Sequence, residues 1–169
     1  MITFAKAITS GYVPLGGVVV GPRVKAPFWE EPIPGAIFRH GYTYSGHATA
    51  CAAAMANLDI MEREDLVGRV RTLEPVVERE IGRLASSPLV GEVRTVGLTA
   101  AVELSAEARA ANPGVVDAVV GACTRNGVLT RNIRGVGLQF SPAFIVTPDE
   151  IARIAEGFDA ALREVAAKA

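Results

Sequence analysis

The stretch "FAKAITSGYVPLGGVVVG", residues 4 to 21, sets the first expectations for the fold and chemistry of this chain. A single lysine, Lys6, lies between two alanines, and a turn-forming segment follows from Ser10 to Pro14. The run "GGVVVG" is apolar and bounded by glycines, which predicts a short buried strand. A lysine amine does covalent chemistry when it is neutral and reaches a carbonyl carbon, and small neighbours leave room for a flat ligand. The alternative is an exposed lysine beside an ordinary loop, which is the commoner environment of this residue.

The composition is that of a globular chain with a substantial core. Of its 169 residues 50% are hydrophobic and 21% are charged, which indicates one domain, or one domain and part of another. The net charge is −1 and no basic run is present, so neither nucleic acid nor a membrane surface is expected as a partner. Cys51 and Cys123 lie far apart, outside any CxxC pattern, which favours a reducing compartment with both thiols buried. Without a leader-like or membrane-spanning segment, the chain is expected to be a cytoplasmic α/β protein.

The first half of the chain predicts a long connection followed by two helices. Residues 22–38 contain four prolines, which favours an irregular segment. The alanine-rich stretch "HATACAAAMANLDIMERE" predicts a helix that is buried on most sides. Apolar residues at spacings of three and four over residues 66–84 predict a second helix, with a kink or break at Pro75.

The remaining segments alternate between strands and helices. "LVGEVRTVGLTAAVEL" predicts two strands around Gly97, and "VLTR" and "GLQFS" predict two short ones. "NPGVVDAVVGACTRNG" predicts a helix capped by Asn112, with Gly127 just past its end. Thr147 and Glu150 form a capping-box pattern at the start of the last helix. This order predicts a self-contained α/β layer domain from about residue 65 onward.

Four segments together resemble one enzyme family. "FAKAITSGYVPLGGVVV" resembles the active-lysine segment of the class III pyridoxal-phosphate-dependent aminotransferases, in the branch of the ω-amino-acid transaminases. "FRHGYTYSGHATACAAAMANLDIMERE" resembles the family's "HG-x-T-Y-S-GH-P-x-A-x-A" stretch. "LVGEVRTVGLTAAVEL" is similar to its small-domain strands, and "GVLTRNIRGVGLQFSPAFIVTPDEI" to its C-terminal closing segment. The four segments follow the family's order and cover essentially the whole chain.

The resemblance implies a fold-type I transferase. Residues 1–64 would be the C-terminal part of the large cofactor-binding domain, with the active-site lysine and the interdomain helix. Residues 65–169 would be the small C-terminal domain. The implied activity is ping-pong transamination between an amine or ω-amino acid and a keto acid such as pyruvate, with pyridoxal 5'-phosphate as cofactor, in a homodimer. A same-family aminomutase or racemase, a subunit of a split enzyme, and a non-catalytic domain are the alternatives.

The resemblance also implies roles for Lys6 and Thr43. Lys6 would be the catalytic residue that binds the cofactor covalently and then moves a proton between substrate and cofactor. Thr43 would donate a hydrogen bond to the cofactor phosphate, in this family usually on the neighbouring subunit. Thr43 and Ser45 precede the alanine-rich helix, and a helix start favours an anion. Simple capping of that helix by Ser45 or Thr43 is the alternative.

Arg131, in "VLTR", matches the position where the family often has an arginine for the substrate carboxylate, a role that suits a planar guanidinium. Arg134 is the competing candidate, and a solvated loop arginine is the alternative for either. His40 and His47 are seven residues apart, without a cysteine or carboxylate cluster, so no metal site is expected.

The chain departs from the family pattern in two kinds of position. Ala48 stands where proline is usual, and Thr95 where glycine is common. The family's second phosphate loop, its ring-stacking aromatic residue and its aspartate for the ring nitrogen would all precede Met1. We therefore expect a C-terminal portion of such an enzyme, with little transaminase activity by itself.

Overall fold

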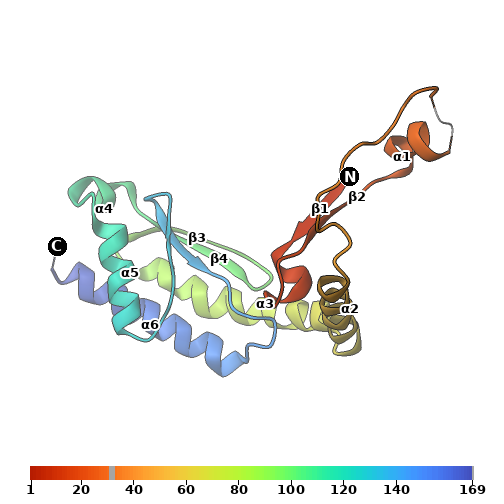
Figure 1. The fold of residues 1–169 in the computed structure, drawn as a ribbon. Helices are drawn as coiled ribbons and strands as arrows, with labels where there is room; N and C mark the ends of the chain where they lie inside the picture. The colour runs from red at the N-terminus through yellow and green to blue at the C-terminus, as the bar shows by residue number, and fades with distance from the viewer. Residues whose placement is uncertain (31–32, 169) are drawn as a thin grey trace. The chain divides into compact units, whose positions relative to one another are not determined.

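The structure is a computed structural model that describes residues 1–30 and 33–168. The chain divides into two compact units, Met1–Asp65 and Leu66–Ala169. Figure 1 shows helices in both units, with a two-stranded ribbon in the first and a larger sheet in the second. None of the helices in the described part of the chain is long and apolar enough to cross a membrane.

A short antiparallel ribbon begins the first unit. Strand β1 (Ile2–Ala5) pairs with β2 (Gly16–Val19), and the 3-10 turn η1 (Lys6–Thr9) follows β1 directly. The strand predicted in "GGVVVG" is therefore confirmed, but its predicted burial is wrong. Val18 and Val19 are 53% and 55% exposed, because β1 is the one strand that pairs with β2 within the described residues.

Helix α1 (Pro22–Trp29) lies where an irregular segment was expected. Pro22 occupies the first helical position, where the missing N–H would have had no helical partner, so this proline is compatible with the helix. Pro27 lies near the end of α1, which stops two residues later. The expectation for Pro32 falls outside the described residues.

The alanine-rich helix α2 (Ala48–Arg63) is confirmed, and His47 caps it, with its Nδ1 accepting a hydrogen bond from the N–H of Ala50 at 3.4 Å. The helix packs against η1. Its predicted burial is wrong, since Ala50 and Ala54 are its buried residues and most of the others are exposed. Cys51 is exposed too, so the expectation of two buried thiols holds for Cys123 alone.

The second unit is built on a four-stranded antiparallel sheet. Its order is β3 (Val90–Val96), β4 (Thr99–Leu104), β6 (Gly137–Phe140) and β5 (Asn132–Ile133). The two strands around Gly97 are confirmed, and Gly97 itself has a φ of +55°, which a glycine adopts without strain. The strand in "GLQFS" is confirmed as β6.

The strand predicted in "VLTR" is wrong. Residues 128–131 pair with no strand in the described chain, and the ladder to β6 begins at Asn132, opposite Leu138. The Thr130 hydroxyl donates instead to the carbonyl oxygen of Gln139, at 2.7 Å. A side-chain hydrogen bond thus holds this segment beside β6.

Five helical segments complete the second unit: α3 (Leu66–Gly82), η2 (Arg83–Ser86), α4 (Ala106–Ala111), α5 (Val115–Arg125) and α6 (Pro148–Ala166). Of the kink or break predicted at Pro75, the break is wrong, because helix α3 continues through this residue. The capping box of α6 is confirmed, with reciprocal hydrogen bonds between Thr147 and Glu150. The predicted cap of α5 is wrong, because Asn112 ends α4 and its side chain accepts from the N–H of Gly114.

The core of the second unit lies between one face of the sheet and helices α3, α5 and α6 (Figure 1). Val102, Leu104 and Leu138 point into it and are fully buried, while Gln139, which follows Leu138 in β6, is not buried. At the centre of the sheet a Cβ on Gly137 would overlap the carbonyl oxygen of Val102, so the two strands approach closely there. The opposite face of the sheet carries polar and charged side chains, among them those of Arg94, Glu103 and Gln139.

Replacing a core leucine should destabilise the second unit strongly. Leu162 of α6 is fully buried, so Leu162→Ala should lower the free energy of unfolding by about 2–5 kcal/mol, measured by chemical denaturation. Leu129, which is 90% exposed, provides the matched control, and Leu129→Ala should change it by less than about 0.5 kcal/mol. Equal effects of the two variants would contradict the helix–sheet core.

One carboxylate makes the stability of the second unit depend on pH. Glu164 accepts hydrogen bonds from Lys168 and Arg125, which lower its pKa from 4.5 to about 2. Because the pKa is lower in the folded state, this stabilisation is present above pH 4.5 and is lost as the pH falls toward 2. The difference in unfolding midpoint between the wild type and Glu164→Gln should therefore shrink over that range.

The control for this measurement is Glu156→Gln, at an exposed position of the same helix without an ion pair among the described residues. Its midpoint difference should stay small at every pH. A wild-type advantage over Glu164→Gln that persists at pH 2 would refute the assignment.

Candidate functional site

The backbone around Lys6 forms an unusual tight turn. Lys6 has a φ of +55°, in the left-handed region that a lysine seldom adopts, so the surrounding contacts must stabilise it. Thr9, at the end of the turn, is 2% exposed, and its hydroxyl donates to the carbonyl oxygen of Val13 at 2.6 Å. The same hydroxyl lies 3.5 Å from the carbonyl oxygen of Lys6. One buried threonine therefore joins the two ends of the segment that follows the lysine.

Asn57 of α2 holds the turn from the other side. Its Nδ2 donates to the carbonyl oxygens of Ala7, at 3.0 Å, and Ile8, at 3.2 Å. Sequence analysis missed this residue. The available signal was an amide in an otherwise alanine-rich helix, where an asparagine contributes little to helix formation. Helix α2 thus anchors the two residues that follow Lys6.

The Lys6 amine differs from the other two lysine amines of the chain. Of the three lysines, Lys25 pairs with Glu30 at 2.8 Å and Lys168 with Glu164 at 2.7 Å. Within the described residues Lys6 has no ion pair and no side-chain hydrogen bond. An amine without a carboxylate partner has no ion pair to lose when it forms a covalent bond.

Lys6 also lines a surface depression within the first unit. Its walls are small or apolar: Ala5, Ala7, Gly11, Val13, Pro14, Leu15 and Gly16. Such walls leave room for a flat aromatic group beside the amine. The residues present therefore fit a planar aldehyde cofactor attached to Lys6.

Thr43 lies in the turn that precedes α2. It is exposed, and among the described residues its hydroxyl has no hydrogen-bond partner. Capping of α2 by Thr43 or Ser45 is wrong, because His47 is the cap and the Ser45 hydroxyl accepts from the N–H of Tyr42 instead. His47 thus lies at the start of α2. The described residues contain no group of His, Cys, Asp or Glu side chains that could hold a metal ion.

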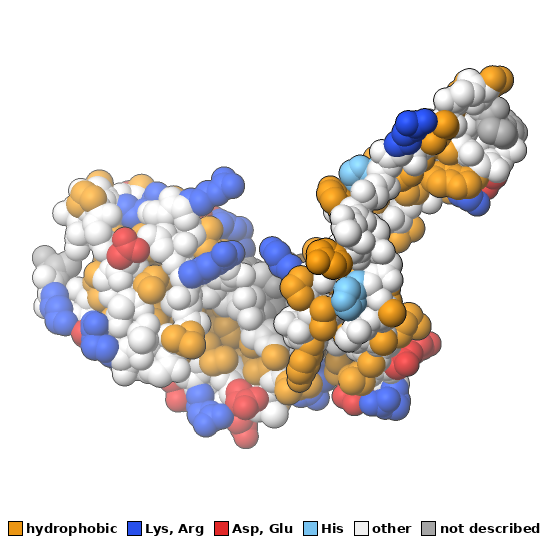
Figure 2. Space-filling view, viewed as in Figure 1, with side chains coloured by type: hydrophobic (Ala, Val, Ile, Leu, Met, Phe, Trp, Pro, Cys, Tyr) orange, Lys and Arg blue, Asp and Glu red, His pale blue; other side chains and the backbone are white. Residues whose placement is uncertain are grey.

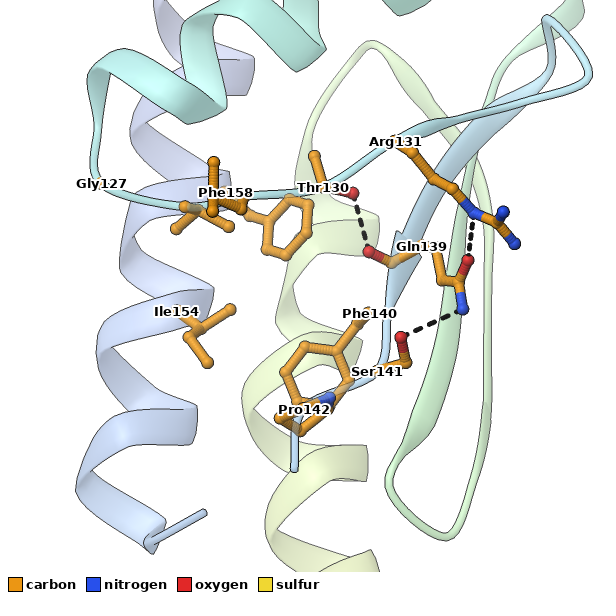
Figure 3. A pocket seen from close by; sticks show the side chains of 11 residues that line it. Gly127, Thr130, Arg131, Gln139, Phe140, Ser141, Pro142, Ile154 and Phe158 are labelled. Atoms are coloured by element: carbon orange, nitrogen blue, oxygen red, sulfur yellow. Dashed lines mark hydrogen bonds between the residues drawn. The ribbon is translucent and has the colours of Figure 1, made fainter. Parts of the chain in front are cut away.

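Arg131 belongs to a pocket in the second unit (Figure 3). Thr130, Gln139 and Ser141 contribute polar groups beside it, and Val128, Phe140, Ile154 and Phe158 form an apolar wall. The Arg131 Nε donates to Oε1 of Gln139 at 2.5 Å, and Gln139 Nε2 donates to the Ser141 hydroxyl at 3.0 Å. Arg134 lies in the turn between β5 and β6, with a φ of +52°, and does not line this pocket.

The structure groups the candidate residues in two places. In the first unit it brings Lys6 together with Thr9 and Asn57, whereas Thr43 lies on a different segment and no hydrogen bond among the described residues joins it to Lys6. In the second unit it brings Arg131 together with Gln139. Gln139 was not a candidate in the sequence, since a lone glutamine in a strand carries no specific signal.

The family model described as "Aminotransferase class-III" matches residues 1–162. Among curated proteins, the chain is 36% identical over 170 residues to a mitochondrial gamma aminobutyrate transaminase 1 of Solanum lycopersicum, covering 97% of this chain and 33% of that protein. It is also 36% identical over 156 residues to a putrescine–pyruvate aminotransferase of Pseudomonas aeruginosa, covering 89% of this chain and 33% of the relative. The chain thus spans about a third of the length of these relatives.

Solved structures agree with the family model. An (S)-enantioselective omega-transaminase from Thermomicrobium roseum matches with a TM-score of 0.84 at 36% identity, over 96% of this chain and 37% of that one. An amine transaminase from an uncultivated Pseudomonas species, with pyridoxal phosphate bound, matches with a TM-score of 0.87 at 35% identity, over 96% of this chain and 38% of that one. The expected fold class, the α/β architecture of fold-type I transaminases, is confirmed over this partial length.

The anchoring of the Lys6 turn by Asn57 can be tested by amide hydrogen exchange. The Ser10 N–H donates to the carbonyl oxygen of Ala7, the same oxygen that accepts from Asn57. Loss of that anchor in Asn57→Ala should speed exchange of the Ser10 amide about five- to tenfold, as expected for one net hydrogen bond. Asn112→Ala, in the other unit, is the control and should leave it unchanged. An unchanged rate in Asn57→Ala would mean that the turn holds without this side chain.

Proposed function

Because the chain belongs to the class-III aminotransferase family, we propose that its protein transfers an amino group between an amine or ω-amino acid and a keto acid such as pyruvate. The family depends on pyridoxal phosphate, and amines and keto acids are its typical substrates. We assign residues 1–64 to the large cofactor-binding domain and residues 65–169 to the small domain. The division of the chain near residue 65 supports this assignment.

The observation that carries the proposal is the environment of Lys6. Its amine has no ion pair within the described residues, and it borders a depression with small walls. Lys6 would hold the cofactor covalently through Nζ, and its freed amine would then carry a proton to and from the substrate carbon. When bound, pyridoxal phosphate supplies the electron sink that lets bonds at that carbon break. Asn57 and Thr9 would keep the amine oriented during these steps.

We propose Thr43 as a ligand of the cofactor phosphate. Its exposed hydroxyl, without an internal partner in the described chain, is available to donate a hydrogen bond to an anion. Its position just ahead of α2 supports the same role, since the free N–H groups of a helix start favour negative charge. Among the described residues no hydrogen bond joins Thr43 to Lys6, which is compatible with a site shared between two subunits.

We propose Arg131 as the ligand of the substrate carboxylate. Its position on the pocket of Figure 3 supports it over Arg134, which does not line that pocket. Arg131 also has no acidic partner among the described residues, so its charge is available to a carboxylate.

A homodimer and a cytoplasmic location complete the proposal. The first unit exposes several large apolar side chains, including Trp29, Phe38 and Tyr42, and Figure 2 shows hydrophobic side chains spread over this part of the surface. Burial of such residues between subunits would account for them. The two unpaired cysteines support a reducing compartment.

The test of this function is the site at which the chain takes up its cofactor. The purified chain is incubated with pyridoxal phosphate, followed by visible absorption, reduced with borohydride and mapped by mass spectrometry. We expect the adduct on Lys6 in clear excess over Lys25 and Lys168, because both of these amines are ion-paired. Lys6→Arg should abolish the absorption band, whereas Lys25→Arg should leave it in place. An adduct spread evenly over the three lysines would contradict the assignment.

A further inference from the structure

We propose that Gln139 is a positioning residue that makes Arg131 receive a carboxylate on its two terminal nitrogens. The inference rests on the proposed role of Arg131 as the carboxylate ligand. It adds which nitrogens of Arg131 bind the carboxylate, and it names Gln139 as the residue that determines this choice.

A guanidinium can bind a carboxylate with two parallel hydrogen bonds along either of two kinds of edge. One edge presents both terminal nitrogens, and the other presents Nε and one terminal nitrogen. In this structure Nε of Arg131 already donates to Oε1 of Gln139, at 2.5 Å. Figure 3 shows the two terminal nitrogens of Arg131 pointing away from the Gln139 amide. The edge with both terminal nitrogens is therefore the one left for a ligand.

Gln139 is itself held on both sides of its backbone and at its amide. It lies in β6, paired with Ala101 of β4, and its carbonyl oxygen accepts from the Thr130 hydroxyl at 2.7 Å. Its Nε2 donates to the Ser141 hydroxyl at 3.0 Å, which directs Oε1 toward Arg131. The amide is thus oriented before any ligand arrives, and it limits the rotation of a side chain that is otherwise flexible.

The neutrality of Gln139 matters as much as its position. Other arginines of the second unit are paired with carboxylates: Arg94 with Glu92 and Glu103, and Arg125 with Glu164. Arg131 is held by an amide instead, and it has no ion pair in the part of the chain that the structure describes. A neutral acceptor fixes the guanidinium without neutralising its charge, so the full charge remains for an incoming carboxylate.

The test uses nitrogen-resolved NMR of the arginine side chains in the full chain, with Arg131→Lys to assign the Arg131 signals. Pyruvate is the probe, and methyl pyruvate, which lacks the carboxylate, is its control. Without a ligand, Gln139→Ala should speed water exchange of the Arg131 Nε–H about tenfold, as expected when a charge-assisted hydrogen bond is lost. In the wild type, pyruvate should shift the signals of the terminal nitrogens and leave the Nε–H signal in place. In Gln139→Ala, it should shift the Nε–H signal as well.

A second variant separates positioning from mere packing. Gln139→Glu keeps the size of the side chain but offers Arg131 an internal carboxylate, so the apparent Kd for pyruvate should rise about two- to fivefold, as expected for an exposed ion pair that competes with the ligand. The control Arg134→Lys should alter none of these signals.

Three results would overturn the inference, and they differ from one another. An Nε–H exchange rate that is the same in the wild type and Gln139→Ala would remove the role of Gln139. A pyruvate-induced shift of the wild-type Nε–H would show that the other edge binds. No pyruvate effect on any Arg131 signal would instead reject the proposed role of Arg131, and the inference with it.

Discussion

The burial of one face of the β3-β4-β6-β5 sheet under α3, α5 and α6 is the constraint on which the second unit depends. Strand side chains alternate between the two faces of a sheet. Because Leu138 lies in the core with Val102 and Leu104, the side chain of Gln139, the next residue of β6, lies on the opposite face. The polar contact between Gln139 and Arg131 is therefore a consequence of how the core is packed.

The first unit is organised in a different way. Its ribbon and α2 bury little, and few contacts determine its local geometry. The Lys6 turn is held mainly by two side chains, Thr9 and Asn57, that bind backbone carbonyl oxygens. Since a left-handed backbone at a lysine is unfavourable by itself, these hydrogen bonds stabilise the conformation that presents the amine. The two candidate ligand groups, the amine and the guanidinium, are thus supported by different kinds of structure.

Sequence reasoning succeeded where a local signal determines the local structure. The capping box at Thr147, the turn at Gly97 and the alanine-rich helix carry their own signals, and all three elements are present. It failed where a particular hydrogen-bonding arrangement, which composition does not reveal, determines the local structure. Residues 128–131 have strand-like composition, but strand pairing with β6 starts only at Asn132. The Asn112 side chain bonds to Gly114 instead of capping a helix at its predicted start. The four prolines of residues 22–38 predict an irregular segment, but α1 begins at Pro22, because the first position of a helix accepts a proline.

For the candidate site, residue types pointed to Lys6, Thr43 and Arg131, but not to their supporting residues. Asn57 lies fifty positions from Ala7 in the sequence, and Gln139 lies eight positions from Arg131, beyond the turn between β5 and β6, so neither contact has a local signature. A side chain that acts by binding backbone carbonyl oxygens, or by orienting another side chain, is recognised only from the three-dimensional structure. This is why the positioning residues emerged from the structure alone.

The most direct test of the account is hydrogen exchange of the whole chain, followed by mass spectrometry, before and after reductive attachment of pyridoxal phosphate. We expect β4, β6, α3 and α6 to exchange slowest in both states, because they form the buried layer. Attachment should slow exchange in peptides covering residues 5–16 and leave the second unit unchanged. Slower exchange confined to other segments, or no change around Lys6, would contradict the assignment of this turn as the cofactor site.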